Sequence, residues 1–185
     1  MVDKKRAACF AGHRSIPYKD INKIRRSLDI AIEELYQKGV IYFGVGGTTG
    51  FNVMAEEAVI RARKKHHEIK LIIILPCKDH DKYWSKETKK RFLNILSKAD
   101  KVICLSDKYY RGCMQNCNRY LVDFSGYCMA YLADDGDEIL YTVDYAYERG
   151  LEFTNITTYF ERPSVIFYDK LNKLLCFALL RRYPI

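Results

Sequence analysis

Glycine and threonine residues cluster near residue 50, between an apolar stretch and a helical one. The run Gly46-Gly47-Thr48-Thr49-Gly50 follows residues 40–45 and precedes Asn52. A glycine-rich turn at a helix N-terminus lets backbone N–H groups approach an anion, and the helix dipole favours negative charge there. The run matches neither the dinucleotide-binding fingerprint nor the Walker A loop. It predicts an anion site, but tight packing of a strand against a helix explains the glycines equally well.

A second polar group, Gly12-His13-Arg14, follows the first apolar stretch of the chain. The Arg14 guanidinium is permanently charged and can fork onto phosphate oxygens. His13 can donate a hydrogen bond to phosphate or sugar, or take part in acid–base chemistry. Taken alone, these residues are more simply interpreted as part of an exposed loop with no binding or catalytic role.

These polar groups need a scaffold, and apolar stretches alternate with helical periodicity along the chain. We expect strands at residues 6–11, 40–45, 70–75, 101–105, 127–133 and 153–156, and helices at 17–38, 50–65, 114–123 and 138–149 with another that Ser85 caps. Such alternation predicts an α/β fold: an open, mostly parallel, doubly wound sheet of five to six strands with helices on both faces. Ligands of such sheets bind beyond the carboxyl ends of the strands, which is where the polar loops fall.

The domain organisation predicted is one nucleotide-binding domain over residues 1–156 and a C-terminal extension over 157–185. A strand at 164–168 and a helix at 170–182 are expected in the extension. The extension would pack on the domain or on the partner of a homodimer.

Composition restricts the class of protein. Apolar residues make up 49% of the 185-residue chain, and the formal net charge is +8 from 31 basic and 23 acidic residues. The basic residues are dispersed over helix faces, so we expect an anionic small molecule and regard nucleic acid as unlikely. Seven cysteines at irregular spacing indicate buried thiols rather than disulfides, and we expect neither a metal nor a cofactor. With no apolar run long enough to span a bilayer, a cytoplasmic location without membrane contact is expected.

Several motifs in the same order resemble the YpsA-like branch of the SLOG superfamily, which also holds the DprA and LOG proteins. The stretch 10–14 looks like the family's F-T-G-H-R opening, and 46–52 with Glu57 is similar to its G-G-A-x-G-x-D-x4-E motif. The stretches 118–123 and 141–146 continue the match, which covers residues 7 to about 156. The resemblance implies a Rossmann-like fold that binds a nucleotide or a nucleotide-derived ligand.

The resemblance also implies a set of site residues. The expected ligand-binding residues are Gly12, His13, Arg14, Gly46, Gly47, Thr48, Thr49, Gly50, Asn52, Trp84, Asn118 and Arg119, and Glu57 is the candidate catalytic residue. Asp123 would orient Arg119.

Three departures from the family pattern bear on function. Asn52 stands where the family usually has aspartate, so this position cannot take a proton. Cys117 stands where an arginine is common, and acidic residues at 134–138 replace a Gly-Gly-Thr segment. We therefore rank ligand binding or sensing first, LOG-like cleavage of an N-glycosidic bond second, and DprA-like DNA binding third. Cleavage would need a carboxylate, for which Glu57 or Glu56 is the candidate near the turn.

Overall fold

The computed structural model describes residues 3–132 and 137–160 of the chain, and for residues 137 and 138 the backbone alone. Six strands are present: β1 (Ala7–Gly12), β2 (Tyr42–Gly46), β3 (Lys70–Leu75), β4 (Lys101–Cys104), β5 (Tyr127–Tyr131) and β6 (Glu152–Asn155). The helices are α1 (Tyr18–Gln37), α2 (Phe51–Arg63), α3 (Lys86–Leu96), α4 (Cys113–Asp123) and α5 (Asp137–Glu148), with short 3-10 turns η1 (Lys4–Arg6) and η2 (Ile156–Tyr159).

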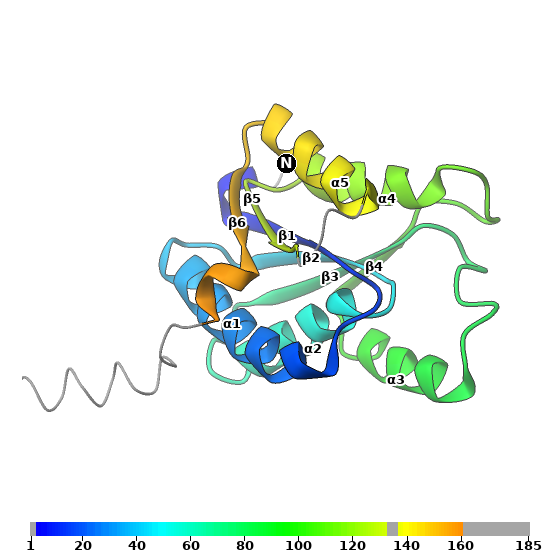
Figure 1. Ribbon diagram of the computed structural model, residues 1–185, viewed down its shortest axis with the longest axis horizontal. Helices are drawn as coiled ribbons and strands as arrows, with labels where there is room; N and C mark the ends of the chain where they lie inside the picture. Colours follow the sequence, from blue (N-terminus) through cyan, green and yellow to red (C-terminus); the bar gives the residue numbers. More distant parts are fainter. Residues whose placement is uncertain (1–2, 133–136, 161–185) are drawn as a thin grey trace, which may run out of the picture.

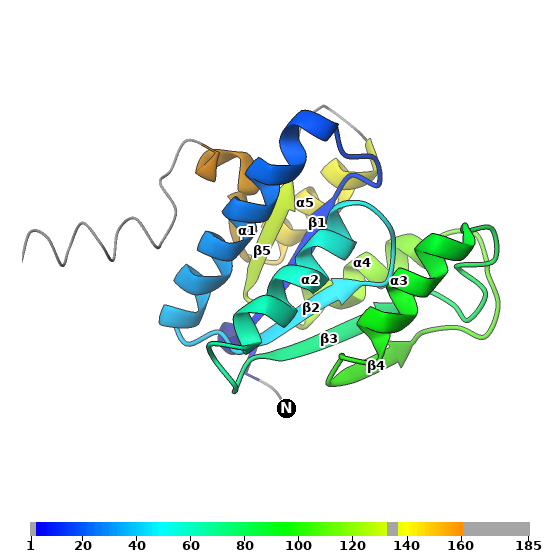
Figure 2. The same ribbon diagram turned by 90° about the horizontal axis from the view of Figure 1, so that it is seen from below.

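The strands form one parallel sheet in the order β4-β3-β2-β1-β5-β6. From β1 the chain winds outward to β4, then crosses back to place β5 on the other side of β1. Helices α1, α2 and α3 cover one face, and α4 and α5 cover the other (Figures 1 and 2). The winding direction therefore reverses between β1 and β5, and in open α/β sheets this switch point is where a crevice opens at the carboxyl ends.

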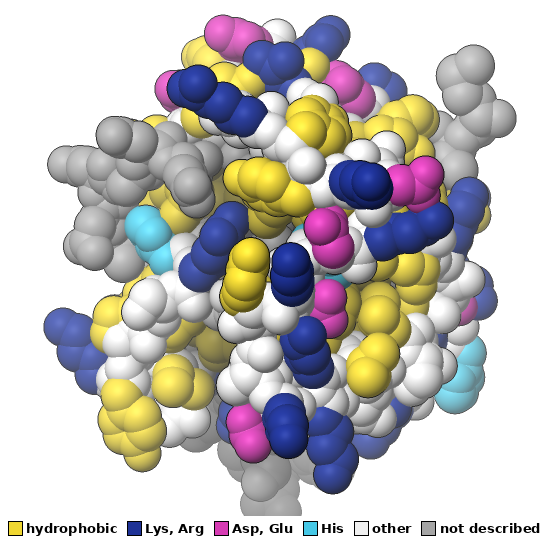
Figure 3. All heavy atoms as spheres, turned by 90° about the vertical axis from the view of Figure 1, so that its right-hand side faces the viewer, with side chains coloured by type: hydrophobic (Ala, Val, Ile, Leu, Met, Phe, Trp, Pro, Cys, Tyr) yellow, Lys and Arg dark blue, Asp and Glu magenta, His cyan; other side chains and the backbone are white. Residues whose placement is uncertain are grey.

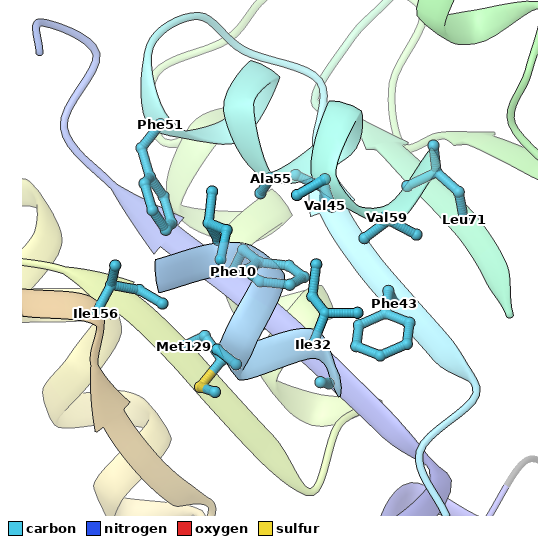
Figure 4. Close-up of a cluster of buried hydrophobic side chains, with 14 of the residues drawn as sticks. Phe10, Ile32, Phe43, Val45, Phe51, Ala55, Val59, Leu71, Met129 and Ile156 are labelled. Atoms are coloured by element: carbon cyan, nitrogen blue, oxygen red, sulfur yellow. The ribbon is translucent and has the colours of Figure 1, made fainter. Parts of the chain in front are cut away.

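The main core lies between the sheet and the helices α1 and α2. Phe10, Phe43 and Val45 project from the strands towards Ile32 of α1 and Phe51 of α2 (Figure 4). All five side chains are at most 2% exposed. The strict inward spacing of apolar residues on these helices makes the sheet and both helices one packed unit, so the loops at the sheet's edge start from fixed positions.

A smaller core lies on the other face, where α4 packs on β2. Gly44 makes this possible, because a Cβ there would lie 2.9 Å from a methyl carbon of Leu121 on α4. Cys117, Leu121 and Val122 of α4 are buried against Cys9, Ile74 and Cys128 of the sheet. The N-terminus of α4 is thereby held at the carboxyl edge.

The structure confirms the fold class, with all-parallel pairing and helices on both faces. Helix and strand ends differ from the sequence-based bounds by a few residues, and η1 and η2 were not anticipated. The strand expected at 164–168, the helix at 170–182 and the acidic residues at 134–136 lie outside the described residues. Of the helices that the structure describes, none combines the length and apolarity of a membrane span.

Candidate functional site

A cavity of about 640 Å³ opens at the carboxyl edge of the sheet, next to the end of β1. Its walls come from the loops after β1, β2 and β4 and from the first turns of α4 and α5. The lining residues are Ala11, Gly12, His13, Arg14, Thr48, Asn52, Tyr109, Arg111, Gly112, Met114, Gln115, Asn118, Ile139, Tyr141 and Thr142. Small-molecule sites typically enclose about 300–1,000 Å³.

The loop after β1 and the N-terminus of α2 form one packed unit. The N–H of Phe51 donates to the carbonyl oxygen of His13 at 3.0 Å. A Cβ on Gly12 would overlap the Phe51 ring, and one on Gly50, which has φ +71°, would overlap the carbonyl oxygens of His13 and Arg14. These glycines let the two segments approach closely, and the approach fixes the backbone from which His13 and Arg14 project.

Asn52 lies inside this unit, and its side chain is only 7% exposed. Its Nδ2 donates to the Gly46 carbonyl at 3.0 Å and to Thr48 Oγ1 at 2.7 Å, while Oδ1 has no partner among the described residues. The Gly46 carbonyl can only accept, so it fixes the orientation of the amide. Asparagine, not the family's aspartate, is the residue that this geometry suits.

The opposite wall comes from α4 and α5. Asn118 lines the cavity and donates from Nδ2 to Thr142 Oγ1 at 2.9 Å, which ties the two helices together. Arg119 does not line the cavity: its guanidinium lies 5.4 Å from the ring centroids of both Tyr141 and Tyr145. It stabilises the α4–α5 contact by cation–π interaction instead.

Asp123 does not orient Arg119. It accepts from the Tyr145 hydroxyl at 3.1 Å and lies 3.3 Å from Arg149 Nε.

The electrostatic character of the cavity is set by Arg14 and Arg111, two exposed arginines on different loops. Its described lining residues include no carboxylate. Figure 3 looks onto this edge of the molecule, where basic and acidic side chains are interspersed over the surrounding surface. Among the described residues, positive charge without a carboxylate is therefore a property of the cavity lining rather than of the surrounding surface.

Other residues predicted for the site line a second cavity of about 390 Å³. Thr49, Gly50 and Glu57 line it, between α1, α2 and α3. Glu57 accepts two hydrogen bonds from Arg91, at 2.8 and 2.9 Å, and this pairing raises the pKa of the Arg91 guanidinium. The turn 48–50 thus separates two cavities, and Glu57 faces the one that Arg14 and Asn118 do not line.

Gly46, Gly47 and Trp84 were predicted to bind the ligand, but they contact other parts of the protein instead. A Cβ on Gly47 would overlap Leu75 and lie 2.9 Å from Phe92, so this glycine permits tight packing of the turn. Trp84 meets Phe92 edge-on, with ring centroids 5.3 Å apart. None of these three residues lines the cavity beside Arg14.

Glu56 is the other carboxylate of α2 near the turn, and it is completely buried. Neither of its oxygens has a hydrogen-bond partner among the described residues. Burial raises its pKa well above the usual range, the neighbouring Glu57 raises it further, and Arg91 opposes the shift. Burial therefore favours the neutral form of this side chain.

The thiols provide no metal site in the part of the chain that is described. No group of three or more histidine, cysteine or acidic residues is arranged there to hold a metal ion. Burial raises the pKa of Cys77 and of Cys117 to about 12, which keeps both thiols protonated.

On the α4 side of the cavity, sequence reasoning singled out Asn118 but not the loop before the helix or its first turn. Tyr109, Arg111, Gly112 and Gln115 all line the cavity. The signal was available, since residues 106–112 are the polar segment that follows β4 at the carboxyl edge. Their contribution depends on the crossover from β4 to β5, which brings the start of α4 over to β1.

A comparison with models of known protein families matches most of the chain to one family. The YpsA model, described as the YspA SLOG family, matches residues 14–161. Curated relatives include UPF0398 protein BH1768 of Halalkalibacterium halodurans, 29% identical over 140 residues, covering 74% of this chain and 71% of the relative. Another is the uncharacterized SPbeta prophage-derived protein YoqJ of Bacillus subtilis, 35% identical over 116 residues, covering 56% of this chain and 68% of the relative.

Two solved structures share the fold. DNA processing protein A (DprA) of Streptococcus pneumoniae has a TM-score of 0.59 at 15% identity, with 80% of this chain and 49% of that one covered. DNA processing protein A of Helicobacter pylori, described with its single-stranded DNA binding mode, has the same TM-score and identity, with 82% and 65% covered. The present chain thus spans about half to two thirds of these structures' length.

Proposed function

Because this chain belongs to the YspA SLOG family, we propose that it binds a nucleotide or a nucleotide-derived anionic small molecule at the carboxyl edge of its sheet. The observation that carries the proposal is the cavity at the β1/β5 switch point, which holds Arg14 and Arg111 and has no carboxylate among its described lining residues. The volume of this cavity, about 640 Å³, and its mixture of polar and apolar lining residues suit a ligand the size of a nucleotide.

Binding without turnover is the role that the geometry favours. Cleavage of an N-glycosidic bond needs a carboxylate beside the sugar. Asn52 is a neutral amide, and Glu57 lies in the other cavity with its carboxylate engaged by Arg91. We therefore propose a ligand-sensing or ligand-binding role ahead of a hydrolase.

Calorimetric titration of the full chain with nucleoside mono- and diphosphates tests this function. Arg14→Ala and Arg111→Ala should each weaken binding about tenfold or more, because each removes a charge-assisted hydrogen bond to the anion. Arg6→Ala is the matched control, since Arg6 is exposed at the amino end of β1, away from the cavity. No binding by wild type, or equal losses in all three variants, would reject the proposal.

Single-stranded DNA is a second candidate ligand. Tyr109 and Tyr110, 64% and 42% exposed, precede Arg111 at the rim, and exposed aromatic rings beside arginine are typical of single-strand binders. The fold shared with DNA processing protein A supports the same candidate. A fluorescent oligonucleotide titrated at two salt concentrations tests it: affinity that hardly changes with salt would argue against a DNA-binding surface.

A further inference from the structure

We infer that the anionic group of the ligand binds at the N-terminus of α4, not at the glycine turn before α2, and that Asn52 accepts a hydrogen bond from a ligand hydroxyl. The ligand class is therefore a phosphorylated polyol, such as the sugar phosphate of a nucleotide. This inference rests on the proposed function, because it places a ligand within the same cavity.

The N-terminus of α4 has open hydrogen-bond donors. The helix begins after Gly112, which has φ +94° and provides no side-chain cap. Cys113 N–H donates to Tyr110 at 3.1 Å and Asn116 N–H to Gly112 at 2.9 Å. The N–H groups of Met114 and Gln115, between them, have no acceptor among the described residues. Both residues line the cavity.

The charge around this helix end reinforces the preference for an anion. Arg111 immediately precedes Gly112, and Arg14 approaches from the loop after β1. An eleven-residue helix carries partial positive charge at this end. Open N–H groups, the dipole and two guanidinium groups therefore act on the same cavity.

The glycine turn already uses several of its donors within the protein. Gly47 N–H donates to Ile74 at 2.8 Å, Thr48 N–H to Gly46 at 2.7 Å, and Phe51 N–H to His13 at 3.0 Å. Thr49 and Gly50 line the other cavity. Three of these donors are therefore used within the protein, and Thr49 and Gly50 face away from the cavity beside Arg14.

Asn52 supplies the second, independent observation. It is only 7% exposed, lines the same cavity, and both partners of its Nδ2 are protein groups. Its Oδ1 has no partner among the described residues. A buried acceptor without a partner is costly, and a ligand hydroxyl would satisfy it.

An amide-resolved NMR titration of the full chain with ribose 5-phosphate, adenosine 5′-monophosphate, adenosine and inorganic phosphate tests the inference. The phosphorylated ligands should shift the Met114 and Gln115 amides more than those of Thr49 and Gly50. Ribose 5-phosphate should bind about tenfold more tightly than inorganic phosphate, because its hydroxyls reach Asn52. Arg111→Ala should weaken adenosine 5′-monophosphate but not adenosine, and Arg6→Ala should weaken neither.

The outcomes separate this inference from the proposed function. Binding with shifts confined to Thr49 and Gly50, or undiminished in Arg111→Ala, would overturn the anion subsite and leave the function standing. Ribose 5-phosphate no tighter than inorganic phosphate would overturn the hydroxyl subsite. If wild type binds none of the four probes, the proposed function and the inference both fall.

Discussion

Gly50 lies against the carbonyl oxygen of Arg14, so closely that a Cβ at position 50 would overlap it. Gly50 also has φ +71°, a conformation that L side chains rarely adopt. This contact joins the start of α2 to the loop after β1, and the position of Arg14 depends on it.

Gly50→Ala should therefore lower the free energy of unfolding by at least about 2 kcal/mol, from backbone strain and overlap together. Gly39→Ala is the matched control: Gly39 has φ +89°, but a Cβ there meets nothing within 4 Å. It should cost only the strain, about 1–2 kcal/mol. Urea unfolding measures both. Equal losses would mean that the contact with Arg14 does not constrain the loop.

Asn52→Asp should destabilise the protein by about 1–3 kcal/mol, because a carboxylate oxygen would replace the amide that donates to the Gly46 carbonyl. Burial and this unfavourable contact would raise the pKa of the introduced carboxyl in the folded state. Stability would then be lost as pH rises above the ordinary aspartate pKa of about 3.9.

The control is Asn116→Asp, since Asn116 is exposed and its Nδ2 donates to the Tyr110 hydroxyl, which can reverse its role. Unfolding measured at pH 5 and pH 8 should show a growing deficit for Asn52→Asp and little change for Asn116→Asp. A deficit at position 52 that is the same at both pH values would contradict this explanation.

Glu56 makes the stability of the fold depend on pH, and removing its carboxyl group should stabilise the protein. Its folded-state pKa is raised, so the native state holds the proton more tightly than the unfolded state. Stability is therefore lost as pH rises from about 4.5 towards the folded-state pKa. Each pH unit between the unfolded-state and folded-state pKa values costs about 1.4 kcal/mol.

Glu56→Gln should thus be more stable than wild type at pH 8, by about 1–3 kcal/mol, with a smaller gain at pH 5. Glu57→Gln, one residue along and partly exposed, should show no such gain. Thermal unfolding at both pH values is the measurement. A gain for Glu56→Gln that does not change with pH would show that the buried carboxyl is not the titrating group.

Glu57 should not act in catalysis, because it lines a different cavity from Arg14 and Asn118. Glu57→Gln breaks the pairing with Arg91, whose side chain is 54% exposed, and should cost less than about 1 kcal/mol. Affinity for adenosine 5′-monophosphate should be unchanged, and neither protein should release adenine on incubation with it. Adenine release by wild type that Glu57→Gln abolishes would restore Glu57 as the catalytic residue.

The sequence predicts the fold well because its periodicity is strong: β3 is apolar at every residue after Lys70, and α1 repeats its inward residues over most of its length. It also predicts the edge where the cavity opens, since Gly12 ends β1 while Arg14 and Asn52 come soon after β1 and β2. It could not reveal which side of the glycine turn each residue faces. Thr48 and Thr49 are adjacent in the chain but line different cavities.

The role of Arg119 was equally hidden from the sequence. Asn118 and Arg119 are neighbours on α4, and helical geometry turns successive side chains by about 100°. Asn118 consequently faces the cavity while Arg119 packs on Tyr141 and Tyr145. Arg111, by contrast, reaches the cavity only because β4 and β5 lie on opposite sides of β1, a relation that the sheet order determines.

A crystal structure of the full chain with adenosine 5′-monophosphate would locate the ligand directly. We expect the phosphate between Arg14 and Arg111, within hydrogen-bonding distance of the Met114 and Gln115 N–H groups, with a sugar hydroxyl on Asn52 Oδ1. The nucleotide in the cavity of Glu57 and Arg91, or the cavity beside Arg14 filled by the protein's own side chains, would contradict the proposed site.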